Sequence, residues 1–149
     1  MILVGVDPGN VTGIAVWWDP RVYEPPDARG TLVTAEVGAA TVPRVLRRML
    51  DGQRPALIAI ERYKQNARKT HQPEAYHVTG AVRSFCEDMM VRCVYQSPSP
   101  AQRIGTHRRL KQLGFYVKSK DNHANAATGH MLLLMATYWP ETYANLIGL

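Results

Sequence analysis

Cysteine is scarce in this sequence. The 149 residues contain only Cys86 and Cys93, with no Cys-x-x-Cys pair and no Cys/His spacing typical of a zinc site. A small scaffold held together by several disulfides is therefore excluded. We expect both side chains to be buried thiols, in a protein that occupies a reducing compartment.

Long apolar runs are also missing. The longest, Met131 to Tyr138, is far shorter than the roughly 20 residues of a membrane span and suits a core helix. The six residues before Asp7 are too few for a signal peptide and carry no basic flank. Hydrophobic residues make up 46% of the chain and charged residues 20%, which is typical of a globular protein. We therefore expect one domain over residues 1–149, in the cytoplasm and without membrane contacts.

Charges of one sign are missing from two segments. No acid occurs from Tyr95 to Lys120, and no lysine or arginine occurs in residues 121–149. Residues 1–60 hold six bases and six acids, whereas residues 61–120 hold twelve bases and four acids. This asymmetry indicates a polyanionic partner such as nucleic acid. It is also compatible with a basic face that only keeps the protein solvated.

Apolar periodicity and turn residues predict three strands, a helix, a strand, a helix, a strand and further helices. The first three strands favour antiparallel pairing, whereas the last two are separated by helices and favour parallel crossovers. The predicted fold is α/β: a mixed five-stranded sheet with helices on both faces. The expected strands are Met1–Val6, Thr12–Trp18, Thr31–Val37, Ala56–Ile60 and Arg92–Gln96, and the expected helices are Pro43–Asp51, Pro73–Val91, a short one after Pro100, Arg108–Leu113 and Asn122 to about Tyr138.

Two acidic residues stand where predicted strands end. Asp7 ends the first strand, and Glu61 comes directly after the apolar run of the fourth. If these strands are neighbours and parallel, both carboxylates emerge at the carboxyl end of the sheet, where open α/β sheets bind ligands. Asp7 before Pro8-Gly9 is also a common turn former. A glutamate at the end of a buried strand, however, must be solvated, paired or bound to a cation.

The start of the last predicted helix adds a cluster of polar residues. On a helix, His123 and His130 share one face, two turns apart, and Asp121 stands at or just before the first turn. Asp121 or Asn122 can be a plain helix cap, and His123 can be a polar residue satisfied beside the core. Together with the two strand-end acids, however, the cluster is typical of a site for a hard metal ion.

Such a site suits the hydrolysis of a phosphodiester. Two divalent ions about 4 Å apart can activate a water and hold the leaving oxygen. Magnesium prefers carboxylate oxygens, and a histidine favours manganese or steers a water. We expect two Mg²⁺ or Mn²⁺ ions, held by Asp7, Glu61, Asp121 and His123.

Four motifs resemble those of one nuclease family. The run Val4–Gly13 closely resembles the first-strand motif of RuvC-like Holliday junction resolvases, of the ribonuclease H-like superfamily, and Ile58–Glu61 resembles their second motif. Ser97-Pro98 and the basic segment after it resemble their proline-led helix. His123–Ala127 resembles the bacteriophage branch, in particular the mycobacteriophage type. The similarity spans nearly the whole chain; the first motif is fairly specific, and the others are short.

The resemblance implies a fold, an activity and partners. The sheet is expected to be ribonuclease H-like, with Asp7 and Glu61 as metal ligands. The implied activity is that of a crossover-junction endodeoxyribonuclease, which resolves Holliday junctions or other branched DNA and leaves a 3′-hydroxyl and a 5′-phosphate. If a phage encodes the protein, it works in the cytoplasm of the host cell.

A four-way junction is two-fold symmetric, so two cuts need two active sites. The resemblance therefore implies a homodimer. The long predicted helix 73–91 can supply the interface through Tyr76, Val82, Phe85 and Met89. These residues can equally belong to the core.

The chain departs from the family at one position. The family's last helix usually carries an acid three residues after the histidine position, and Ala126 stands there. Either Asp121 replaces the missing ligand in a natural protein, or the alanine was introduced to inactivate the enzyme, which the intact motif around it favours. In both cases metal occupancy is expected to fall unless Asp121 compensates.

Basic residues flank the predicted site in the sequence. Phosphate contacts of this kind position DNA without reading its sequence. Tyr63 can stack on an unpaired base at a junction centre, or can be a partly buried loop aromatic. The residues expected to contact DNA are Arg62, Tyr63, Lys64, Arg68 and Lys69 after Glu61, and Arg103, Arg108, Arg109, Lys111, Lys118 and Lys120 before His123.

Three other functions remain open. Asp7-x-Gly9 with Thr12 also resembles the phosphate loop of actin-like and sugar-kinase ATPases, which have two such domains and far more residues. With Ala126, the chain can instead be a junction-binding protein that has lost cleavage. The fold also permits a ribonuclease, or a processing nuclease that acts on flap DNA.

Overall fold

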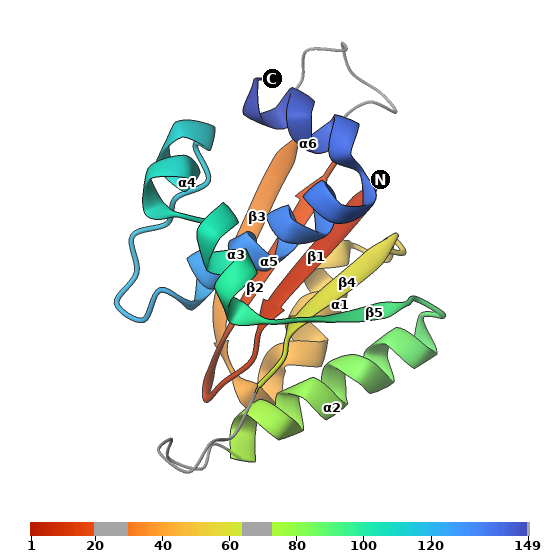
Figure 1. Ribbon diagram of the computed structural model, residues 1–149. Helices are drawn as coiled ribbons and strands as arrows, with labels where there is room; N and C mark the ends of the chain where they lie inside the picture. The colour runs from red at the N-terminus through yellow and green to blue at the C-terminus, as the bar shows by residue number, and fades with distance from the viewer. Residues whose placement is uncertain (20–29, 64–72, 149) are drawn as a thin grey trace.

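The computed structural model describes residues 1–19, 30–63 and 73–148. Its strands are β1 (Ile2–Asp7), β2 (Val11–Trp18), β3 (Thr31–Gly38), β4 (Leu57–Glu61) and β5 (Cys93–Gln96). They form one mixed sheet in the order β3-β2-β1-β4-β5 (Figure 1). β2 runs antiparallel to both β1 and β3, whereas β4 runs parallel to β1 and to β5. The predicted mixed sheet, with its first three strands antiparallel, is confirmed.

The central strands β1 and β4 are buried on both faces, which explains their unbroken apolar sequences. All six residues of β1 are buried, and so are the first four of β4. The parallel register sets Val6 beside Ile60. Each strand continues for one more residue, so Asp7 and Glu61 stand next to each other at the carboxyl end of the sheet.

Helices cover both faces of the sheet (Figure 1). On one face lie η2 (Ala39–Thr41), α1 (Val42–Leu50) and α2 (Pro73–Asp88). On the other lie α3 (Pro98–Ile104), α4 (His107–Leu113), α5 (His123–Tyr138) and α6 (Pro140–Ile147). Successive β1 residues therefore enter two apolar cores: Val4 and Val6 pack with α1 and α2, and Leu3 packs with α5. No helix in the described ranges is long and apolar enough to cross a membrane.

Two glycines let α5 lie close against the sheet. A β-carbon on Gly5 would collide with the carbonyl oxygen of Ala127, and one on Gly13 would collide with that of His123. The backbone of α5 therefore approaches β1 and β2 more closely than side chains at these positions would permit. This approach brings the first turn of α5 to the carboxyl end of β1.

Three differences from the sequence prediction are larger than a shift of one residue at the end of an element. α2 ends at Asp88 instead of Val91, because the chain turns at Met90 with a left-handed φ of 53°. α3 begins at Pro98 rather than after Pro100, since proline is favoured in a first helical turn. Pro140 does follow the end of α5, but it also begins α6, a helix that the sequence did not predict.

Cys86 and Cys93 form a disulfide, so the prediction of two free thiols is wrong. The tight turn after α2 reverses the chain into β5 and brings the two Cα atoms to 6.5 Å, a separation that a disulfide can span. The bridge joins the end of the helix to the start of the strand. The two cysteines therefore give no support to a reducing compartment.

The residues proposed for a dimer interface are mostly core residues. Val82 and Phe85 are buried between α2 and the sheet, and Met89 packs against the same core. Of the four, only Tyr76 is an exposed side chain. An interface on this side of α2 therefore has few apolar residues of that set to use.

Candidate active site

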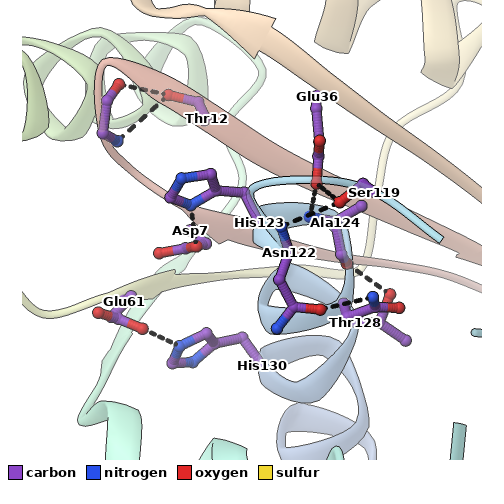
Figure 2. Close-up of polar contacts among 12 residues, drawn as sticks. Asp7, Thr12, Glu36, Glu61, Ser119, Asn122, His123, Ala124, Thr128 and His130 are labelled. Carbon is purple, nitrogen blue, oxygen red and sulfur yellow. Dashed lines mark hydrogen bonds and ion pairs between the residues drawn. The ribbon is translucent and has the colours of Figure 1, made fainter. Parts of the chain in front are cut away.

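Asp7 and Glu61 meet at the carboxyl ends of β1 and β4. Asp7 is buried, with 9% of its surface exposed, whereas Glu61 is half-buried. Figure 2 shows both carboxylates beside α5, each in contact with one histidine of that helix. Residues 54 positions apart in the sequence are thus gathered at one place, as the strand-end argument predicts.

Each carboxylate contacts a different histidine of α5. His123 Nδ1 lies 2.7 Å from Asp7 Oδ2, and His130 Nε2 lies 2.8 Å from Glu61 Oε2 (Figure 2). The histidines are two turns apart, so a single face of α5 serves both strands. The sequence predicted this shared face. It did not predict that His130 meets Glu61, because spacing fixes the direction of a helical side chain but not its partner.

The start of α5 is capped by a residue of β3. Glu36 Oε1 accepts hydrogen bonds from the Ala124 N–H at 2.9 Å and from the Ser119 hydroxyl at 2.7 Å (Figure 2). The side chain of Asn122, at the N-cap position, makes no capping hydrogen bond. The interpretation of Asn122 as a plain cap is therefore wrong, and a carboxylate from a distant strand caps the helix instead.

Thr12 fixes the turn between β1 and β2. Its buried hydroxyl donates to the Gly9 carbonyl at 2.9 Å and accepts from the Gly9 N–H at 3.3 Å (Figure 2). The threonine of the first motif therefore holds the turn that follows Asp7, which keeps the end of β1 in one conformation.

The electrostatics of the two acids favour a bound positive charge. Burial raises the pKa of Asp7, the hydrogen bond from His123 opposes this, and repulsion from Glu61 adds to it. The same hydrogen bond to Asp7 raises the pKa of His123 above its ordinary value of 6.5. The pair therefore holds a proton beside a second carboxylate. A cation in that place would relieve the same repulsion.

One hollow of about 400 Å³ collects the predicted metal ligands. Asp7, Glu61, His123 and the exposed Asp121 all border it, together with Tyr63. Within the described part of the chain, no group of three or more His, Cys, Asp or Glu side chains is placed so that it could hold a metal ion. The donors fit instead an ion that is held by one or two carboxylates and keeps several waters, as magnesium does.

A second hollow of about 250 Å³ also reaches Glu61. Ala126 and the buried His130 line it, with residues of α3 and α4 on the opposite side. The methyl group of Ala126 therefore borders a space next to Glu61. An aspartate at this position would extend into that space.

The basic segment that follows Glu61 is described only in part. Tyr63 packs edge-on against Tyr76, with 5.1 Å between the ring centroids, and also borders the larger hollow. Arg62 lies next to it on the exposed side. The remaining predicted DNA contacts of this segment, Lys64, Arg68 and Lys69, lie outside the described residues.

The predicted DNA contacts before His123 form a second basic set, and two of its members have partners inside the protein. The Arg109 guanidinium donates to the Tyr143 hydroxyl at 2.8 Å, which ties α4 to α6. The Lys111 ammonium lies 4.9 Å from the centroid of the Tyr116 ring. The other members of the set are exposed: Arg103, Arg108, Lys118 and Lys120.

No family model and no curated protein matches this sequence. A solved structure of RuvC from Thermus thermophilus superposes with a TM-score of 0.70, over 95% of this chain and 96% of that chain, at 16% identity. This chain has the RuvC fold. T. thermophilus RuvC in complex with a Holliday junction substrate gives 0.69 at 17% identity, with the same coverage. The Fowlpox virus resolvase with Holliday junction DNA gives 0.54 at 13% identity, over 91% of this chain and 99% of that chain.

At such identities the likeness to RuvC establishes the fold alone. The ribonuclease H-like sheet that the first motif implied is confirmed, in strand order and in pairing. The activity of the site depends on the side chains of this chain and not on the fold.

Proposed function

We propose that this chain has the active site of a metal-dependent endonuclease of Holliday junctions or related branched DNA, and that Ala126 slows or abolishes its cleavage. The proposal rests above all on the meeting of Asp7 and Glu61 at one end of a RuvC-like sheet, beside an open hollow. The solved structures support the choice of substrate, because two of the similar proteins are in complex with Holliday junctions.

Asp7 and Glu61 would hold the divalent metal, with Asp121 and His123 at the edge of the same hollow. We expect two Mg²⁺ or Mn²⁺ ions. When bound, they would activate a water and supply positive charge that stabilises the leaving oxygen. The chain's own part is to orient these carboxylates. The strand register sets their spacing, Thr12 fixes the turn after Asp7, and each acid is contacted by a histidine of α5.

We expect little cleavage by this chain, because alanine stands at position 126 where the resembling family usually has an acid. Asp121 borders the larger hollow with Asp7, whereas Ala126 borders the smaller one with Glu61 and His130. Asp121 can therefore assist Asp7 but does not stand where an acid at position 126 would stand. We infer that this chain cleaves slowly or not at all. Junction binding without cleavage is the second candidate function, and the same alanine favours it.

DNA would reach the site across a basic surface. The exposed bases of α3, α4 and the segment before α5 can contact phosphates, and Tyr63 at the larger hollow can meet an unpaired base. A homodimer would give the two-fold junction its two sites. A bacteriophage source stays a prediction from the resemblance.

Glu61→Gln tests the proposal, because it removes the charge and keeps the shape. In an Ala126→Asp background it should abolish cleavage of a labelled four-way junction and leave the junction Kd within about twofold, since phosphate contacts carry the affinity. The matched control is Glu87→Gln, an exposed carboxylate of α2 that pairs with Arg83. Cleavage by Glu61→Gln at the parental rate would show that the metal site does not include Glu61.

A further inference from the structure

His130 is a polar residue that the fold has enclosed. It is 1% exposed and lies in the second full turn of α5, yet both of its ring nitrogens have partners. Nε2 is 2.8 Å from Glu61 Oε2, and Nδ1 is 2.9 Å from the side-chain amide of Gln96. A buried histidine with two side-chain partners is held in one orientation.

Glu61 and Gln96 are placed for this contact by the sheet. The two residues are paired in the parallel register of β4 and β5, so their side chains leave the sheet on the same face. His130 reaches them from the helix that covers that face. β4, β5 and α5 therefore each contribute one side chain to a continuous contact. Gln96 is buried, and Glu61 borders the smaller hollow.

The surroundings of Gln96 fix which way its amide points. One end of the amide is 3.1 Å from the His130 carbonyl oxygen, which can only accept, and the other is 3.3 Å from the Leu134 N–H, which can only donate. The NH₂ group therefore faces His130 and the oxygen faces Leu134. In this orientation the amide nitrogen donates to His130 Nδ1.

The orientation of Gln96 determines the tautomer of His130. Because Nδ1 accepts from Gln96, the ring proton of the neutral imidazole is on Nε2, directed at Glu61 Oε2. A neutral donor fixes the carboxylate without cancelling its negative charge. Glu61 Oε1 then keeps its lone pairs for another partner.

We propose that His130, set by Gln96, is a positioning residue that holds the Glu61 carboxylate in the orientation needed to bind a divalent cation. The inference rests on the proposed function, since it assumes that Glu61 is a ligand. It assigns His130 a different place from His123, which borders the larger hollow with Asp7. His130 borders the smaller hollow, beside Ala126, and does not border the larger one.

The first test needs no variant. A long-range ¹H–¹⁵N spectrum of the imidazoles, recorded on the intact protein without metal at neutral pH, reports the tautomer of each histidine. We expect the Nε2–H form for His130. An Nδ1–H form would overturn the proposal, because the donor to Glu61 would be absent.

The second test measures Mn²⁺ binding by electron paramagnetic resonance, without DNA. His130→Leu fills the buried space without a donor and should weaken Mn²⁺ binding about 10–100-fold, the usual loss when a ligand's supporting partner is removed. His130→Gln carries an amide donor and should recover most of this loss. His77→Gln, at an exposed position of α2, is the matched control and should bind as the parent does. Thermal unfolding without metal reports whether each variant is folded.

Glu61→Gln, measured in the same way, separates the two proposals. If Glu61→Gln weakens Mn²⁺ binding and a folded His130→Leu does not, the role of His130 is overturned while the metal site stands. If Glu61→Gln also binds as the parent does, the proposed function fails at this residue, and the inference about His130 fails with it. If His130→Leu does not fold, parental Mn²⁺ affinity in His130→Gln together with the Nε2–H signal supports the proposal, and the Nδ1–H signal rejects it.

Discussion

The hydrogen bond between Asp7 and His123 leads to a prediction about one residue. It raises the pKa of His123, whereas burial of the ring acts in the opposite direction. In Asp7→Asn the carboxylate is removed and the burial stays, so the pKa of His123 should fall. An NMR titration of the His123 ring measures this directly. The control is Asp88→Asn, which changes a carboxylate paired with Arg47 on the other side of the sheet and should leave the His123 titration unaltered. An unchanged pKa of His123 in Asp7→Asn would contradict the pairing of His123 with Asp7.

At the scale of residues, the two acids of the site were predictable, and the contact of His130 was not. Asp7 and Glu61 could be predicted, because a carboxylate that ends a buried strand is rarely placed there by packing. The partner of His130 could not be predicted, since periodicity gives a direction from the helix and no information about which strand lies there. Its seven-residue spacing from His123 was the one signal that pointed to it.

At the scale of elements, Glu36 ties β3 to the first turn of α5. Although burial acts to raise it, hydrogen bonds from the Ala124 N–H and the Ser119 hydroxyl hold the pKa of Glu36 below its ordinary value of 4.5. Such a carboxylate stabilises the folded state above about pH 4.5, and the contribution is lost as the pH falls through the lowered pKa. The capping bonds therefore contribute at neutral pH.

Glu36→Gln should lower the free energy of unfolding by about 0.3–1 kcal/mol at pH 7, the usual contribution of a carboxylate at a helix N-terminus. The difference from the parent should shrink as the pH falls below about 4.5 and through the lowered pKa of Glu36. Urea unfolding at pH 7 and in acid measures both values. Equal stability of the two proteins at pH 7 would mean that the negative charge of Glu36 adds nothing to the cap of α5.

Elements are predictable where the sequence repeats and are missed where it turns. The five strands follow from apolar runs, because each is bounded by residues that break a sheet. α6 was missed because Pro140 marks both the end of one helix and the start of the next, and the sequence prediction used only the first of these roles. The Cys86–Cys93 bridge was missed because it depends on the sharp turn at Met90, which has no strong sequence signal.

At the scale of the whole molecule, the exposed bases of α3 and α4 predict a non-specific DNA surface. Arg103→Ala with Arg108→Ala should weaken junction binding to a similar degree for different junction sequences. The slope of log K against log salt concentration is negative, and its magnitude should decrease by about 0.7–0.9 for each phosphate that the double variant no longer binds. Fluorescence anisotropy over a range of salt measures this. The control is Arg83→Ala, a base of α2 that pairs with Glu87; an unchanged slope in the double variant would place the DNA elsewhere.

The fold as a whole was predictable because local pattern and family resemblance agreed. Strand spacing favoured a mixed sheet, the first motif implied a ribonuclease H-like one, and the RuvC fold confirms both. The assembly could not be derived in the same way, since the apolar residues of α2 serve the core of one chain.

The central claim is that the end of this sheet cleaves branched DNA with the help of a metal. The most direct measurement is cleavage of a labelled four-way junction in Mg²⁺ and then Mn²⁺, with linear duplex and flap DNA as controls, by this chain and by Ala126→Asp. Because residue 126 borders the space next to Glu61, we expect Ala126→Asp to cut the junction symmetrically, and this chain to cut it at least about 10-fold more slowly or not at all. If neither protein cuts while both bind the junction tightly, the chain is a junction-binding protein and the claim of cleavage is wrong.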